Sequence, residues 1–200
     1  MSKIFIKTAN GLLSLIVVLF MLTAGLYSAY ALWDNNRIYA AAEDVQLDML
    51  KFKPQAEAEE QAERISFAEI LAVNEDVCAW VTLDNTHIDY PVLQGETNLS
   101  YINTDVYGNF ALSGSIYLDS RNSRTFADDY SLLYGHHMDK GRMFGDLDLY
   151  KDEAFFDANR TGTLITPDGV FPLDVLAVLT VTSSDRVFLT PLTGSTTTTA

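Results

Sequence analysis

The chain has 200 residues, of which 48% are hydrophobic and 12% aromatic, and it carries a formal net charge of −14 from 27 acidic and 13 basic side chains. This composition predicts a packed globular domain rather than a disordered chain, and the acidic balance without a basic stripe makes nucleic acid an unexpected partner. A single cysteine, Cys78, excludes an intramolecular disulfide framework and any cluster of thiolate metal ligands.

The first predicted element is a membrane-spanning helix. Residues 11–33 contain no charge and are long enough to cross ~30 Å of hydrocarbon. Lys3 and Lys7 precede this run, so the positive-inside rule predicts a single-pass protein of the cell membrane, with residues 1–10 cytoplasmic and the remainder extracellular. The alternative is a cleaved signal peptide, because Ala29-Tyr30-Ala31 has the small-x-small form of a cleavage site.

Residues 34–65 are predicted to form a helical stalk or linker. They are rich in Ala, Glu, Gln and Lys, and their apolar side chains recur at helical spacing: Ile38, Ala42, Val45 and Met49. Pro54 is expected to break or kink this helix. Ser66 and Glu69 have the spacing of a capping box, so a folded domain over residues 66–200 is expected to begin there.

Beyond Asn74, short apolar or alternating runs separated by turn residues predict β-strands. The runs are Cys78–Leu83, Ile88–Leu93, Ser115–Leu118, Ser131–Tyr134, Thr163–Thr166 and Val170–Val181. Residues Gly145–Asn159 are predicted to be helical. The pattern indicates a mainly β domain, a barrel or a sandwich with a few helices.

Histidine is the first candidate for proton transfer, because its unperturbed pKa lies near neutrality. His87 is expected to be structural or at the surface. His136 and His137 are adjacent at a strand end, where neighbours point to opposite faces, so they are not expected to chelate one ion. From spacing alone, His136 can be either functional or structural.

No metal site is predicted. The acidic residues that could suggest one are separated by distances that fit no loop with alternating oxygen ligands: Asp119, Asp128, Asp129 and Asp139. Cys78 lies in an apolar run typical of an interior strand, where a thiol behaves as a small apolar side chain.

Four segments, taken in order and spacing, resemble the class B sortases. They are Ile88-Asp89-Tyr90-Pro91-Val92-Leu93-Gln94-Gly95, Gly114-Ser115-Ile116-Tyr117-Leu118-Asp119-Ser120-Arg121-Asn122, Leu133-Tyr134-Gly135-His136-His137-Met138 and Gly141-Arg142-Met143-Phe144-Gly145-Asp146-Leu147. The resemblance covers about Ser66 to Asp185 and implies a sortase-type closed β-barrel with short helices.

The resemblance also implies an activity: a membrane-anchored cysteine transpeptidase that cleaves the C-terminal sorting signal of secreted proteins and joins them to an amine of peptidoglycan or of a pilin. It needs no cofactor. His136 matches the family's catalytic histidine, and Asn98 and Ile102, four apart on an expected short helix, match positions that line the peptide groove.

The sequence departs from the family in its nucleophile. The family's cysteine and arginine belong to segments that have no counterpart before Ala200, so the chain is expected to hold about six of eight barrel strands with an unpaired edge, and to be inactive as written. Two alternatives are a catalytically dead, membrane-tethered peptide-binding module and a metal-dependent envelope hydrolase using His136.

Overall fold

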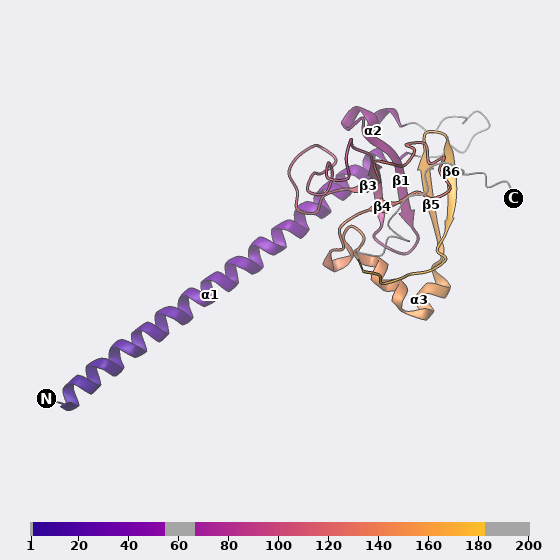
Figure 1. Cartoon of the computed structure of the whole chain (residues 1–200). Coiled ribbons are helices and arrows are strands. Elements are labelled where there is room, and N and C mark those ends of the chain that lie inside the picture. Colours follow the sequence, from indigo (N-terminus) through magenta and orange to yellow (C-terminus); the bar gives the residue numbers. More distant parts are fainter. Residues whose placement is uncertain (1, 55–66, 183–200) are drawn as a thin grey trace. The chain divides into compact units, whose positions relative to one another are not determined.

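The computed structural model describes residues 2–54 and 67–182 and divides into two compact units, Met1–Ala40 and Ala41–Ala200. Helix α1 (Ser2–Met49) forms the first unit and continues into the second (Figure 1). Among the described residues it is the one helix that is long and apolar enough to cross a membrane.

The last turns of α1 are part of the second unit. The predicted apolar stripe exists, but Ala42 and Met49 are buried in that unit. The short 3₁₀ helix η1 (Leu50–Phe52) follows, and helical structure stops before Pro54, as expected, because a proline disfavours the helical conformation of the residue before it. The predicted stalk reaches beyond the described residues and stays a prediction as a separate element.

A six-stranded mixed sheet forms the second unit, in the order β4-β3-β2-β1-β5-β6. The strands are β1 (Val77–Leu83), β2 (Asp89–Leu93), β3 (Ile116–Leu118), β4 (Leu133–Tyr134), β5 (Thr161–Thr166) and β6 (Gly169–Asp174). Among the strands that the structure describes, β2 and β3 pair in parallel and the other neighbours pair antiparallel. A parallel pair requires a crossover, which here is the long segment between β2 and β3.

Central strand β1 is buried on both faces, which explains its continuous apolar sequence. On one face, Trp80 packs in a core with Met49 of α1 and Ile70 of α2 (Ala68–Val73). On the other face, Val81 packs in a second core with Met143. The end of α1 and α2 therefore belong to one core, and the segment that follows β4 belongs to the other.

The described residues do not form the closed barrel of the family, but their open six-stranded sheet agrees with the expectation of about six barrel strands and an unpaired edge. Closure requires the two outer strands of a sheet to bond to each other. Strand β4 has two residues, and β6 contains Pro172, which has no N–H to donate to a neighbouring strand. The sheet is open at both edges within these residues.

Two local predictions are also corrected, and a third is not tested. The run Val170–Val181 is strand only as far as Asp174. The predicted helix Gly145–Asn159 is two elements, the 3₁₀ helix η3 (Gly145–Lys151) and α3 (Glu153–Ala158), because the Asp152 side chain between them accepts from the Phe155 N–H and starts a new helix. Ser66 of the predicted capping box lies outside the described residues. Figure 1 shows α2 and α3 near opposite ends of the sheet.

Candidate active site

His136 lies two residues beyond the end of strand β4, after Gly135, and lines a surface pocket of about 140 Å³. The other lining residues are Ile102, Tyr117, Tyr134 and Gly135. Tyr117 and Tyr134 are directly paired across β3 and β4, which places their rings 5.3 Å apart on one face. The pocket therefore combines an aromatic wall with one imidazole.

The side chains of Ile116 and Phe144 pack closely against Gly135, the residue between β4 and His136. A Cβ on Gly135 would lie 2.3 Å from Ile116 Cδ1 and 2.8 Å from Phe144 Cδ2, so a larger residue would require these two side chains to move. One residue later, the His136 carbonyl accepts from the Phe144 N–H at 2.9 Å. His136 is thus held by its own backbone and by the glycine before it.

Within the described part of the chain, the ring of His136 makes a polar contact with a backbone carbonyl. Its Nε2 lies 2.8 Å from the carbonyl oxygen of Ile102, a residue 34 positions earlier in the crossover segment. The structure therefore brings together two of the three predicted site residues. Asn98 does not line this pocket.

Asn98 and Ile102 do not share a helix face, because residues 98–103 form turns rather than the expected short helix. The Asn98 amide donates to Asp119 Oδ2 at 2.9 Å, and its carbonyl oxygen accepts from the Ser120 N–H at 2.7 Å. These bonds use the side chain to hold the segment after β3. A role for Asn98 in peptide binding stays a prediction.

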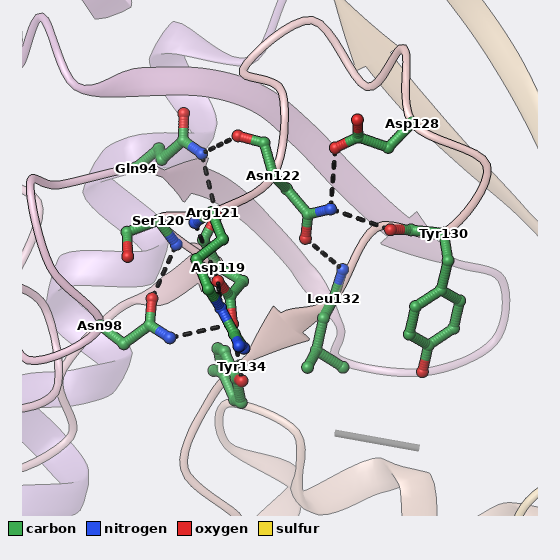
Figure 2. A network of polar contacts seen from close by, with 10 residues as sticks. All are labelled: Gln94, Asn98, Asp119, Ser120, Arg121, Asn122, Asp128, Tyr130, Leu132 and Tyr134. Carbon is green, nitrogen blue, oxygen red and sulfur yellow. Dashed lines mark hydrogen bonds and ion pairs between the residues drawn. The ribbon is translucent and has the colours of Figure 1, made fainter. Parts of the chain in front are cut away.

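Asp119 is the centre of a polar network that includes the pocket residue Tyr134 (Figure 2). Its carboxylate is fully buried and accepts five hydrogen bonds: three from the Arg121 backbone and guanidinium, one from Asn98 and one from the Tyr134 hydroxyl. The Arg121 guanidinium, above all, holds the pKa of Asp119 well below its usual range. A buried carboxylate is stable here because its lone pairs are satisfied.

The network reaches the pocket through Tyr134. Burial, and then the bond to Asp119, raise the pKa of Tyr134 to about 12. The phenol therefore remains a protonated donor at physiological pH and is fixed at its outer end by Asp119. Asp119 does not line the pocket, but its hydrogen bond orients the Tyr134 side chain, which does.

The other two histidines lie on separate parts of the surface. The His137 ring is 55% exposed and pairs with Asp148 at 3.1 Å. The His87 ring is 64% exposed, and its Nδ1 lies 2.8 Å from Asp146. In the described part of the chain, no three His, Cys, Asp or Glu side chains are grouped so that they could hold a metal ion.

Cys78 lies in β1, as predicted, and is 2% exposed. Its thiol donates to the Val92 carbonyl at 3.4 Å. Burial raises the pKa of Cys78 to about 12, so the thiolate, which is the nucleophilic form, is scarce at neutral pH. Cys78 has the properties of a core residue.

The pocket tyrosines and Asp119 were not identified as site residues from the sequence. Their signal was present in part, since Tyr117, Asp119 and Tyr134 all belong to segments that resemble a known family. What was missing was the pairing of β3 with β4, which only the register reveals.

Comparisons with known proteins agree with that resemblance. No family model matches the chain. Sortase B of Staphylococcus aureus is 30% identical over 140 residues, which are 70% of this chain and 57% of that protein, and Sortase B of Listeria monocytogenes is 33% identical over 120 residues, which are 60% and 49%. The chain thus spans about half the length of the curated relatives it matches.

Solved structures give the same result. A Streptococcus pyogenes class B sortase involved in pilus biogenesis is 45% identical with a TM-score of 0.52, over 55% of this chain and 61% of that one. Staphylococcus aureus sortase B is 29% identical with a TM-score of 0.54, over 70% of this chain and 64% of that one. The chain belongs to the class B sortase family.

Proposed function

We propose that the chain carries the histidine part of a sortase active site. Such a site cleaves a secreted protein within its sorting signal and joins the new carboxyl end of that protein to an amine. The observation that carries this proposal is His136 at the end of β4, in a pocket with Tyr117 and Tyr134, in a chain of this family. The aromatic wall suits an extended peptide whose scissile bond lies beside the imidazole.

In the proposed reaction, a thiolate attacks the carbonyl carbon of the scissile peptide bond and forms a tetrahedral oxyanion. As the C–N bond breaks, the His136 imidazolium gives its proton to the departing amine, which leaves a thioester and a neutral ring. The acceptor amine then attacks the thioester carbonyl and loses a proton to His136. The C–S bond breaks and the thiolate returns.

Cys78 is unsuited to be this thiolate. It is buried, it donates to Val92 O, and its raised pKa keeps it protonated. We therefore propose that the nucleophile, and the arginine that would stabilise the oxyanion, come from chain outside these 200 residues. On this proposal the 200 residues alone are inactive in transpeptidation.

Substrate and acceptor are proposed from the relatives. One Staphylococcus aureus sortase B structure is a substrate complex, another sortase B structure is a complex with triglycine, and the Streptococcus pyogenes relative is involved in pilus biogenesis. We propose a sorting-signal peptide as the first substrate and a peptidoglycan or pilin amine as the second. Asn98 and Ile102 are proposed to contact the peptide.

The proposed location is the outer face of a bacterial cell membrane, with α1 as a single-pass anchor. Lys3 and Lys7 before the uncharged run support a cytoplasmic N-terminus. Helix α1 is long enough and apolar enough to cross a membrane. Protease digestion of intact protoplasts tests this, because an extracellular domain is digested and a cytoplasmic one is protected.

A second candidate is a membrane-tethered module that binds the peptide without cleaving it. The burial of Cys78, the one thiol in the sequence, favours it. An incubation assay distinguishes the two candidate functions. The natural protein, purified in detergent, is mixed with triglycine and with peptides copied from sorting signals of the same genome. Cleavage with a triglycine adduct, seen by mass spectrometry, supports the transpeptidase, and binding without cleavage supports the module. A protein that neither binds nor cleaves the peptides would contradict both candidates.

A further inference from the structure

The contact between His136 and Ile102 determines where the ring carries its proton. A carbonyl oxygen can only accept, so Nε2 at 2.8 Å from Ile102 O must be the donor. This holds for the neutral ring and for the imidazolium. Nδ1 is then the ring nitrogen that gains and loses a proton.

Gly114 lies directly against the same carbonyl. Its φ is +56°, a conformation that side chains with a Cβ rarely adopt. A Cβ on Gly114 would also lie 2.4 Å from Ile102 O and 2.7 Å from Tyr101 O. Both atoms are backbone atoms that cannot rotate away.

The neighbouring residue holds this arrangement in place. The Ser115 N–H donates to Tyr101 O at 3.0 Å, and the Ser115 hydroxyl donates to Thr104 O at 2.8 Å. The turn that carries Ile102 is therefore fixed to the residues that enter β3. Gly114 is the point at which the two backbones touch.

We propose that Gly114 is a positioning residue which, by allowing the Ile102 carbonyl to reach the ring, fixes His136 as the Nε2–H tautomer and reserves Nδ1 for proton exchange with the reacting groups. The catalytic meaning of this device rests on the proposed function. The contact and its effect on the tautomer do not.

The test is the tautomer of His136, read from ¹⁵N chemical shifts and two-bond couplings of the chain labelled at histidine, in detergent micelles at alkaline pH. The chain has three histidines, so His136→Gln assigns the ring. The matched control for G114A is G108A. Gly108 also has a positive φ, +82°, but its Cβ would meet nothing within 4 Å.

We expect the wild-type ring and the G108A ring to be in the Nε2–H form. In G114A the ratio of Nε2–H to Nδ1–H should fall about 5-fold, which corresponds to losing one hydrogen bond of ~1 kcal/mol. An unchanged ratio in folded G114A would overturn the role of Gly114, and so would an equal fall in G108A.

The wild-type spectrum tests the proposal even where G114A does not fold. A ring that is mainly Nδ1–H, or evenly mixed, contradicts the fixed Nε2–H donor without any variant. Because the readout is spectroscopic and needs no turnover, a positive result together with an inactive protein would leave the positioning device intact and count against the proposed function alone.

Discussion

Replacing Asp119 by Asn tests whether the buried network supports the pocket. In the wild-type chain, Oδ2 of Asp119 accepts from Asn98, Tyr134 and Arg121. An amide nitrogen at that place meets three donors and can accept from none of them. The shape of the side chain is kept, so the change removes acceptor capacity and charge and leaves packing largely unchanged.

The expected loss follows from the two neutral donors. The Arg121 side chain is half exposed and can turn to water, so its bonds are left out of the sum. Asn98 and Tyr134 each lose a bond to a charged acceptor, which is worth about 1.5 kcal/mol. The free energy of unfolding should therefore fall by about 3 kcal/mol.

The assay is urea unfolding of the full chain in detergent micelles, followed by the fluorescence of buried Trp80 in a Trp33→Phe background. Asp129→Asn is the matched control. Asp129 is exposed in the loop that follows Asp119, and its replacement by Asn removes the same charge. A difference between the two variants below about 0.5 kcal/mol, the usual range of surface substitutions, would refute the reasoning.

The difference in unfolding free energy between the wild-type chain and D119N is predicted to depend on pH. The folded-state pKa of Asp119 is depressed, so its contribution is present above the unfolded pKa of ~3.9 and is lost as the pH falls through the lower folded value. The difference in stability between wild type and D119N should be constant from about pH 7 to pH 5 and shrink below about pH 4. A difference that grows on acidification would contradict the ion pair with Arg121.

Two further variants test the cores. Cys78→Ala should reduce the free energy of unfolding by only ~1 kcal/mol and leave peptide binding unchanged, because the thiol is a packed side chain bonded to Val92 O; loss of binding in a stable variant would contradict this. Met49→Ala should reduce it by about 3 kcal/mol, because Met49 is 1% exposed in the core, whereas Leu47→Ala, 56% exposed on the same helix, should cost little; equal effects would mean that the end of α1 is not part of the domain.

The sequence predicted the strands well where their apolar runs were short and bounded. The segments that became β1 and β2 were placed to within one residue, because turn residues delimit a buried central pair. The run after Gly169 was extended too far, because apolar residues continue beyond Asp174 whereas strand pairing among the described residues ends there. Periodicity reports which residues are apolar and cannot report where pairing stops.

The site was predicted in part for a similar reason. His136 was identified from a motif, and its pocket with Ile102 exists. The helix expected to carry Asn98 and Ile102 is a set of turns, because the side chain and backbone bonds around Ser120 and Ser115 compete with helical ones. Contacts 34 residues apart, such as His136 with Ile102, depend on the crossover path and leave no local signal in the sequence.

The proposed proton transfer from His136 to the departing amine is tested most directly by measuring cleavage of a sorting-signal peptide by the natural protein, purified in detergent, and by its H136A and H137A variants. His137 is the matched control, because it is the adjacent imidazole but pairs with Asp148. A general acid contributes roughly 10²–10⁴-fold, so H136A should lose at least about 100-fold in kcat while H137A stays near wild type. Wild-type turnover in folded H136A, or an equal loss in both variants, would contradict the account.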